Sequence, residues 1–352
     1  MFSSSMRSTL IALTASAVTA SASGLTLSVA GSDATDASKF VVSAKLTNNG
    51  KETLKLLNEP NSLLSKFATN SFGISNAAGK SPAFNGVKVK FSPELAAKSN
   101  DDSLFTIIEP GKSVTIDHNL GSAYNFTSTG EDAYTVQPRT VFTLVDADGK
   151  VSSIKADVEE AASKVTAKLS GVLSVARKTG HSKRAYEGCS DDQQSTLVEA
   201  AKAAQGLAEE SSSYLTDNTA STDRYASWFG EYTDDRHSTV SEHFSKMLDH
   251  PYADYTFDCS TCDEPSTYAY VYPDDDTTIY LCEVFWSTTT TGTDSRAGTL
   301  IHESSHFNSI GGTDDHVYGQ DGAGDLASSD PDTAIDNADN HEYFAENTPA
   351  QD

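Results

Sequence analysis

Cysteine and lysine are divided between the two halves of this chain, and that division limits what each half can fold into. All four cysteines lie after residue 184, whereas 16 of the 18 lysines lie before residue 185. Residues 1–184 hold 20 basic and 16 acidic side chains, and residues 185–352 hold 5 and 34, so the formal charges are +4 and −29. Each half is long enough for its own core, since domains commonly run to about 100–200 residues. The sequence therefore predicts two domains with different roles, and the polyanionic second half argues against nucleic-acid binding.

The N-terminus has the pattern of an export signal. Arg7 is followed by an uncharged, mainly apolar stretch over 10–18 and then by Ala20-Ser21-Ala22. This pattern is typical of a secretory signal peptide over residues 1–22, and the apolar run is well short of the about 20 residues that a membrane-spanning helix needs. We therefore expect a secreted, extracellular protein that has no membrane anchor and acts as a monomer.

An even number of cysteines in an exported domain favours two disulfides. Sequence alone allows three pairings among the four. A four-cysteine zinc site is the competing interpretation, but it would want two CxxC-like pairs, and only one pair is close in sequence. The cysteines are Cys189, Cys259, Cys262 and Cys282.

The boundary between the halves carries a dibasic step, Lys183-Arg184, within a polar stretch. Exposed polar linkers are where proteolytic nicking concentrates. Because charge and cysteine content also change here, we predict that a dibasic processing protease cuts after Arg184. Residues 23–184 would then be a propeptide, and residues 185–352 the mature domain. An independent binding domain is the alternative role for the first half.

The first half is predicted to be β-rich. Short, mostly alternating runs separated by Gly, Asn, Asp and Pro are typical of strands in an antiparallel sandwich. Residues 156–172 resemble a short helix that leads into the linker, and Asn125-Phe126-Thr127 is a sequon for N-glycosylation. No catalytic constellation is evident in this half. The predicted strands cover 25–29, 40–46, 87–91, 113–116 and 140–145.

The second half is predicted to be mainly helical with a small sheet. Runs at 268–272 and 278–282 predict paired strands across a Pro-Asp-Asp-Asp turn. The expected fold class is α+β, with a mainly helical domain and a small antiparallel sheet preceded by a β-rich, sandwich-like domain. Helices are expected over 191–215, 222–248, 298–307 and 332–346.

The chemistry concentrates in the motif His302-Glu303-Ser-Ser-His306. Histidines at i and i+4 of a helix project from one face, so both imidazoles can reach one cation. Glu303 can take the proton of a metal-bound water, which zinc makes acidic enough to attack a carbonyl group near neutral pH. The alternative is a solvent-facing helix that carries two histidines by chance. Apolar residues on both sides of the motif favour the catalytic interpretation.

A catalytic zinc needs a third protein ligand and an open fourth position. Ser309 and Gly312 stand where a HExxHxxGxxH motif would need glycine and histidine, which excludes that class of zinc site. The nearest plausible glutamate, Glu342, lies far downstream. The stretch 311–319 follows instead, and its glycines allow a sharp reversal that could carry an aspartate back to the metal.

Together, the two motifs resemble the signature of the deuterolysin-like (aspzincin) zinc metallopeptidases, HExxH followed by GTxDxxYG, and every fixed position of 312–319 matches. The resemblance implies that His302, His306 and Asp315 hold one Zn²⁺. It also implies that Glu303 is the general base and that the Tyr318 hydroxyl stabilises the oxyanion. The neighbours Asp314 and His316 are physically credible ligands too, but the motif places them beside the ligand position.

Further segments, among them 268–273, 291–295 and 337–344, resemble the fungal peptidyl-Lys metalloendopeptidase branch of this family. That branch cuts on the N-terminal side of lysine, and the resemblance implies that Asp339 and Glu342 bind the P1′ lysine. Their i, i+3 spacing places both carboxylates on one face of a helix. The resemblance also implies two disulfides, Cys189–Cys259 and Cys262–Cys282.

The expected function is a secreted zinc metalloendopeptidase, made as a pre-pro-enzyme, that hydrolyses protein and peptide bonds before lysine. Its acidic surface would favour lysine-rich substrates. One alternative is a deuterolysin-like protease of broader specificity, which would share the zinc site and differ at the pocket. The other is a non-enzymatic acidic binding module with a structural zinc, although such sites normally have four protein ligands and no fourth is evident here.

Overall fold

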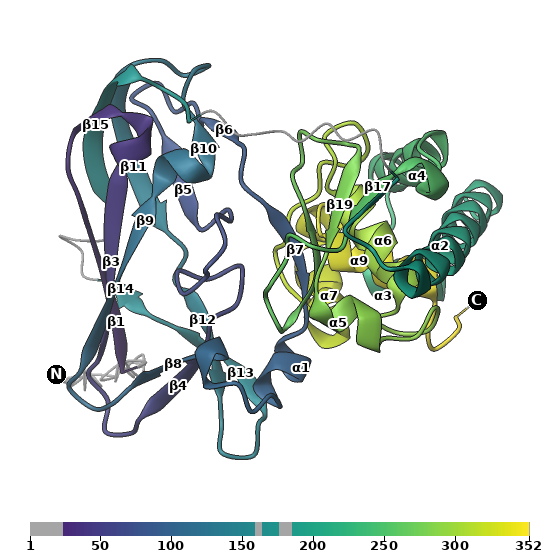
Figure 1. Cartoon of the computed structure of the whole chain (residues 1–352), viewed down its shortest axis with the longest axis horizontal. Helices are drawn as coiled ribbons and strands as arrows, with labels where there is room; N and C mark the ends of the chain where they lie inside the picture. The colour runs from purple at the N-terminus through teal and green to yellow at the C-terminus, as the bar shows by residue number, and fades with distance from the viewer. Residues whose placement is uncertain (1–23, 159–163, 176–184, 352) are drawn as a thin grey trace, which may run out of the picture.

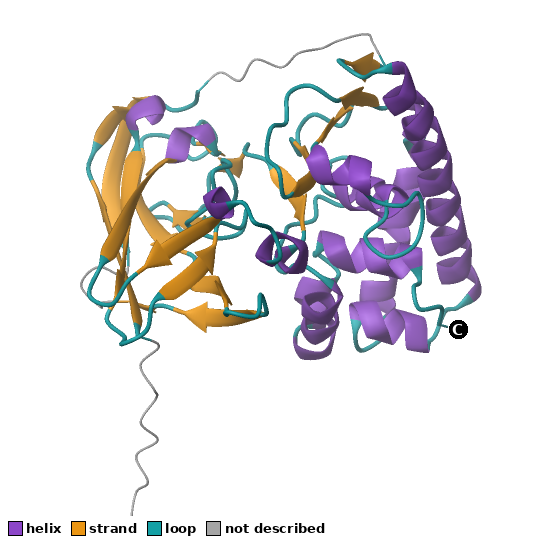
Figure 2. Ribbon diagram, turned by 60° about the horizontal axis from the view of Figure 1, so that its bottom comes forward, coloured by secondary structure: helices purple, strands orange, loops and turns teal. Residues whose placement is uncertain are grey.

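The structure is a computed structural model that describes residues 24–158, 164–175 and 185–351. The expected signal peptide, 1–22, and the dibasic step Lys183-Arg184 lie outside these described residues. Within them, no helix has both the length and the apolar character needed to cross a membrane. The chain forms a β-rich N-terminal region and a mainly helical C-terminal domain, which lie beside each other in Figures 1 and 2.

The N-terminal region consists of three four-stranded sheets and a short strand pair. The sheet orders are β14-β1-β3-β9, β2-β15-β11-β5 and β13-β12-β4-β8, and β10 pairs with β6. Alternate side chains of β3, among them Val42 and Leu46, enter a core that also takes Phe72 and Val136 from the second sheet. The apolar residues that alternate along the sequence of β3 are thus the residues whose side chains are buried. The strand bounds are β1 Leu25–Gly31, β2 Ala34–Asp36, β3 Val41–Asn48, β4 Leu54–Leu57, β5 Phe72–Ser75, β6 Ala83–Phe84, β8 Phe105–Ile108, β9 Ser113–Asn119, β10 Tyr124–Asn125, β11 Asp132–Pro138, β12 Val141–Val145, β13 Val151–Lys155, β14 Asp157–Val158 and β15 Val165–Val172.

The helix predicted over 156–172 is wrong for the described part of that stretch. Strand β15 pairs antiparallel with β11, from Asp132↔Leu169 to Val136↔Val165. Its buried residues Val165, Ala167 and Leu169 recur at every second position, which is the period of a strand. The alanines and lysines of the segment suggested a helix, but the period-two apolar pattern and the pairing with β11 decide the outcome.

The C-terminal domain is built from helices around a small sheet, and two predicted helices are each divided in two. Gly230 ends α3 at a φ of 73°, where a Cβ atom would lie 2.0 Å from the carbonyl oxygen of Ala327. The expected helix over 222–248 is therefore α3 and α4, and the one over 332–346 is α8 and α9. The helix bounds are α1 Pro93–Ala97 in the N-terminal region, then α2 Asp191–Asp217, α3 Asp223–Phe229, α4 Asp234–Asp249, α5 Glu283–Ser287, α6 Arg296–Ser305, α7 Gln320–Ser329, α8 Pro331–Ala334 and α9 Ala338–Glu346.

The sheet of the C-terminal domain has the order β16-β17-β19-β18-β7. The predicted antiparallel pair, β18 (Thr267–Val271) with β19 (Thr278–Leu281), is confirmed. However, β16 (Tyr186–Glu187), β17 (Thr256–Asp258) and β19 run parallel, so the sheet is mixed rather than purely antiparallel.

One edge strand of this sheet comes from the other half of the chain. Strand β7 (Lys88–Phe91) leaves the β-rich region and pairs antiparallel with β18, as Figure 1 shows between the two parts of the molecule. All four of its residues are buried. The run over 87–91 was expected to be a strand of the first domain, but its sheet partner belongs to the second.

Two disulfides brace the C-terminal domain. Cys189 is bonded to Cys259 and Cys262 to Cys282, the pairing that the family resemblance implies. The first disulfide links the segment before α2 to the residue after β17. The second links the loop between β17 and β18 to the residue after β19. The sequon residue Asn125 lies half-buried in β10, and its side-chain oxygen accepts a hydrogen bond from the backbone N–H of Thr127.

Candidate active site

Helix α6 carries the HExxH motif through the interior of the C-terminal domain. Ser295 caps it by accepting a hydrogen bond from the backbone N–H of Gly298. His302, Glu303 and His306 are fully buried. The alternative of a solvent-facing helix with two chance histidines is therefore wrong.

Three side chains of the motif segments converge on one point. The Nε2 atoms of His302 and His306 lie 3.1 Å apart, and each lies 3.3 Å from Oδ1 of Asp315. Tetrahedral zinc with bonds of about 2.0–2.1 Å holds its ligand atoms about 3.3 Å from one another. Within the described residues, Oδ1 of Asp315 is buried without a hydrogen-bond partner. The spacing and this free carboxylate oxygen both fit a zinc ion.

An oxygen atom beside Nδ1 of each imidazole, on the side of the ring away from the Nε2 atoms, fixes the orientation of both rings. Nδ1 of His306 lies 2.8 Å from the carbonyl oxygen of Thr313, and Nδ1 of His302 lies 2.8 Å from Oδ1 of Asp339. A histidine that donates from Nδ1 to an oxygen presents the lone pair of Nε2 to a cation. The reversal that brings Thr313 and Asp315 back to α6 uses the positive φ of Gly312, 62°.

The neighbours of Asp315 do not join this cluster. Asp314 forms a salt bridge with Lys88 and accepts a hydrogen bond from Asn70. His316 faces Asp336, with Nε2 2.9 Å from the carboxylate. A second group of possible ligands consists of Nδ1 of His302 with Asp339 and Glu342, but an ammonium group lies against its two carboxylates, as described below.

Glu303 lies on α6 between the two histidines, and Tyr318 lies three residues after Asp315 in the segment before α7. Oε1 of Glu303 accepts a hydrogen bond of 3.0 Å from the backbone N–H of Lys90, and burial raises the pKa of this carboxyl group to about 8. Tyr318 packs edge-on against Phe91, with ring centroids 5.8 Å apart. Burial, with Asp315 nearby, holds the pKa of Tyr318 well above its ordinary value, so its hydroxyl group stays a hydrogen-bond donor.

The two acidic residues expected to bind lysine lie together on α9, and a lysine of this chain lies between them. Nζ of Lys90 lies 2.8 Å from Glu342 and 3.1 Å from Asp339, and all three side chains are fully buried. Two further groups, which sequence reasoning assigned no role, complete the pocket. Nζ lies 3.0 Å from Oδ1 of Asp294 and 3.4 Å from the hydroxyl group of Tyr343.

The positions of these two residues explain why they were missed. Tyr343 stands one helical turn after Asp339, a spacing that could have identified it. Asp294 has a φ of 51°, and its backbone N–H donates to Glu346, 3.0 Å away, on the far side of the pocket. Such a long-range contact leaves no pattern in the local sequence.

Close packing of α6 against α9 holds the pocket in place. A Cβ atom on Gly298 would lie 2.0 Å from Oε1 of Glu346 and 3.0 Å from Oε1 of Glu342. Oε1 of Glu346 also accepts hydrogen bonds of 2.8 Å from both the backbone N–H and the hydroxyl group of Ser295. A glycine at position 298 is what lets both carboxylates come this close to α6.

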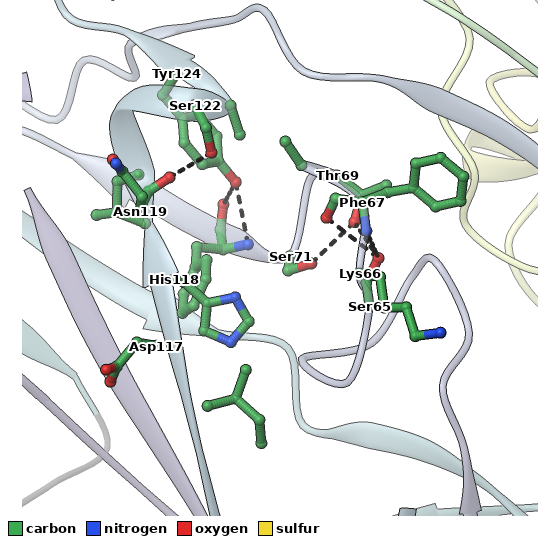
Figure 3. A pocket seen from close by; sticks show the side chains of 15 residues that line it. Ser65, Lys66, Phe67, Thr69, Ser71, Asp117, His118, Asn119, Ser122 and Tyr124 are labelled. Carbon is green, nitrogen blue, oxygen red and sulfur yellow. Dashed lines mark hydrogen bonds between the residues drawn. The ribbon is translucent and has the colours of Figure 1, made fainter. Parts of the chain in front are cut away.

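Figure 3 shows a different pocket, of about 340 Å³, within the N-terminal region. Ser65, Thr69 and His118 are among its lining residues. None of the residues of the histidine cluster or of the lysine pocket lines it.

A buried set of two histidines from a HExxH motif and an aspartate from the segment after it, with a glutamate beside them, defines the class of zinc metallo-endopeptidases. Residues 214–346 match the family described as "Lysine-specific metallo-endopeptidase". The chain belongs to the peptidyl-Lys metalloendopeptidase family: it is 55% identical to the "Peptidyl-Lys metalloendopeptidase" of Armillaria mellea and 49% identical to that of Grifola frondosa, in each case over 100% of both chains. A solved "zinc peptidase from Grifola frondosa" is 56% identical, with a TM-score of 0.46, over 47% of this chain and 100% of that one. As a metallo-endopeptidase, this chain acts on peptide or protein substrates.

Proposed function

We propose that this chain is the secreted precursor of a zinc endopeptidase that hydrolyses peptide bonds with lysine in the P1′ position. The observation that carries the proposal is the buried ammonium group of Lys90, held by Asp339, Glu342 and Asp294 beside the histidine cluster. A buried cation is tolerated only where such partners offset its loss of hydration. A pocket with this charge would exclude neutral and acidic P1′ side chains, which disfavours a deuterolysin-like protease of broad specificity.

In the proposed mechanism, His302, His306 and Asp315 hold one Zn²⁺. The bound metal supplies a Lewis acid that polarises the scissile carbonyl group and acidifies a water molecule. Three protein ligands leave the open position that catalysis needs, which disfavours a purely structural metal in a binding module.

The proton transfers fall to Glu303. Its carboxylate takes a proton from the attacking water and passes it to the leaving amine, a role that fits its contact with the backbone N–H of Lys90 in β7. Tyr318 donates a hydrogen bond to the oxyanion of the tetrahedral intermediate. The P1′ lysine is placed by ion pairs with Asp339 and Glu342, and a compact ammonium suits this narrow site better than the broad guanidinium group of arginine.

The same proposal covers the maturation of the protein. The signal-peptide pattern over 1–22 and the two disulfides support secretion. The β-rich region, with its sandwich-like sheets, is the propeptide, which a dibasic processing protease separates after Lys183-Arg184. The mature domain is a monomer with a charge that favours lysine-rich substrates and disfavours nucleic acid.

The test is a digestion map. A denatured protein of known sequence is digested with the secreted, processed form, and the new N-termini are sequenced. We expect lysine as the first residue of nearly every fragment. Frequent fragments that begin with arginine or a neutral residue would instead support the broader protease.

A further inference from the structure

Strand β7 lies at the edge of the five-stranded sheet as an extended peptide, and its backbone N–H groups donate hydrogen bonds to residues proposed for catalysis. The N–H of Val89 donates to Oδ2 of Asp315 over 2.9 Å, and the N–H of Lys90 donates to Oε1 of Glu303 over 3.0 Å. The nitrogen of the Val89–Lys90 peptide bond is therefore in contact with the proposed general base. It is the atom that must receive a proton if this bond is hydrolysed.

The side chain of Lys90 occupies the lysine pocket completely. It is fully buried, and its Nζ contacts Asp294, Asp339 and Glu342 at 2.8–3.1 Å. Burial alone would lower the pKa of this amine, but these carboxylates hold it well above the ordinary value, so the side chain is an ammonium ion. Lys90 thus fills the place of a P1′ residue, and Val89 that of the residue before the cut.

The neighbouring residues of β7 fix the register of the strand. Val89 pairs with Tyr270 and Lys90 with Ala269 of β18, so β7 is added to the sheet edge as a bound peptide strand would be. On one side of the bond Lys88 pairs with Asp314, and on the other Phe91 packs against Tyr318. A slip of one residue would turn the Lys90 side chain to the opposite face of the strand.

We propose that the Val89–Lys90 bond is a self-cleavage site, held in the active centre as the first substrate of the protein. This inference rests on the proposed function. One water is consumed: its oxygen bonds to the carbonyl carbon of Val89, the C–N bond breaks, and one of its protons passes through Glu303 to the nitrogen of Lys90. The second proton passes from the new carboxyl group to the new amine, so the products are a carboxylate at Val89 and an ammonium group at the new N-terminus, Lys90. This terminus lies within the proposed propeptide and far from the dibasic step.

The experiment uses the full chain with Lys183→Ala and Arg184→Ala, so that dibasic processing does not intervene. The protein is prepared in chelator, zinc is added, and the fragments are followed by intact mass and N-terminal sequencing. We expect a chain that begins at Lys90 to form at a rate that does not change over a tenfold range of protein concentration, because the bond is cut within the same molecule.

Two lysine variants in the same background provide the matched comparison. Lys88→Ala removes a lysine two residues away that is paired with Asp314 rather than held in the pocket, and it should still yield the Lys90 terminus. Lys90→Ala should yield no cut at this position. Glu303→Gln should also stop the cut.

A second measurement needs no turnover. In the zinc-free chain, acetylation of lysine amines read by peptide mass mapping should leave Lys90 at least about tenfold less modified than the exposed Lys51 and Lys112, since Lys90 is fully buried. Complete acetylation of Lys90 under native conditions would overturn the inference.

An added lysine-containing peptide separates the two hypotheses. If zinc-loaded Lys90→Ala cleaves that peptide but the parent never forms a Lys90 terminus, the self-cleavage site is wrong and the proposed function stands. A parent that cuts before Lys88 as fast as before Lys90 overturns the site in the same way. If the secreted, processed form, from which β7 has been removed, does not cleave the peptide either, the proposed function fails together with the self-cleavage site.

Discussion

Nδ1 of His302 and Oδ1 of Asp339 lie 2.8 Å apart, so one carboxylate joins a proposed zinc ligand to the proposed lysine pocket. The same side chain contacts Nζ of Lys90 at 3.1 Å and accepts a 2.7 Å hydrogen bond from the backbone N–H of Gly319. Asp339 therefore contacts a proposed metal ligand, the proposed lysine pocket and the backbone of the residue after Tyr318. Asp339 was expected to bind the P1′ lysine, and the structure adds a contact with His302 that the sequence did not indicate.

Asp339→Asn should accordingly impair more than the preference for lysine. Groups that orient a zinc-bound histidine typically contribute about 10–100-fold to metal affinity or activity. We expect zinc affinity to fall within that range and kcat/KM to fall for every substrate. Zinc competition with a chelating dye and kinetics on matched Lys and Arg peptides measure both effects.

Asp294→Asn is the matched control, because Asp294 contacts Nζ of Lys90 but neither histidine of the cluster. We expect its zinc affinity to equal that of the parent while KM for lysine substrates rises. If the two variants behaved alike in zinc binding, the dual role of Asp339 would be rejected.

Glu303→Gln should keep zinc and lose turnover. The amide retains the shape of the side chain but cannot take a proton, and general acid–base catalysis contributes about 10²–10⁴-fold to rate. We expect one zinc per chain by elemental analysis and a loss of kcat in that range. Residual activity within a factor of ten of the parent would remove the general-base assignment.

Gly298→Ala should weaken the pocket although residue 298 touches no substrate. The new Cβ atom would lie 2.0 Å from Oε1 of Glu346, so this carboxylate must move and give up its hydrogen bonds to Ser295, or α6 and α9 must separate. We expect a lower Tm and a higher KM for lysine peptides. Gly324→Ala, also within a helix but with nothing within 4 Å of the new Cβ atom, is the control; it gains the same helix propensity without a clash, so its Tm should rise slightly and its KM should not change. A Tm for Gly298→Ala equal to that of this control would show that the contact is not tight.

Acid should destabilise the domain through His341. Burial, with His243 nearby, lowers the pKa of His341 to about 3, against about 6.5 in an unfolded chain. Between these values only the unfolded state binds the proton, so this contribution to stability is complete above pH 6.5 and is lost as pH falls toward 3. His341→Gln keeps a donor for the carbonyl oxygen of Asn337 but cannot titrate.

The measurement is Tm of the zinc-free chain between pH 7.5 and pH 5. We expect a smaller decrease in Tm for His341→Gln than for the parent. Zinc-free protein removes the separate effect of acid on metal binding. Parallel curves for the two proteins would contradict the assignment.

The two disulfides should differ in their contribution to stability. The Cys189–Cys259 bond spans 70 residues and the Cys262–Cys282 bond spans 20. The chain-entropy relation gives about 4 kcal/mol for the longer loop and about 3 kcal/mol for the shorter. Denaturant unfolding of the two paired Cys→Ala variants should therefore show the larger loss without Cys189–Cys259. The reverse order would show that native-state contacts outweigh loop length.

Local patterns predicted those features whose cause is local. The amphipathic run over 191–215 is α2, and the i, i+4 histidines share a face of α6 because helical periodicity alone places them there. The break at Gly230 was missed because the crowding that demands a glycine comes from Ala327, which lies far along the chain. Asp294 was not predicted as a pocket residue for the same reason, because its backbone is held by a hydrogen bond to Glu346, which is distant in sequence.

Strand β7 shows most clearly what a local sequence pattern does not predict. Its alternating residues identify a strand, but periodicity does not name a partner, and β7 joins β18 instead of a neighbour in its own half. Nothing in the local sequence distinguishes Lys88 and Lys90 from the other lysines of the first half. The burial of Lys88 and Lys90 follows from carboxylates more than two hundred residues away in sequence, which only the folded structure brings together.

The place of β7 at the edge of the five-stranded sheet also bears on aggregation. An edge strand presents unpaired N–H and C=O groups that can recruit strands of other chains. While β7 is present, the outer edge of β18 is paired. If the β-rich region is removed as proposed, that edge opens to solvent, and the formal charge of −29 on residues 185–352 would then keep copies of the domain apart. On the proposed maturation route, the β-rich region therefore covers this edge against strands of other chains for as long as the chain is uncut.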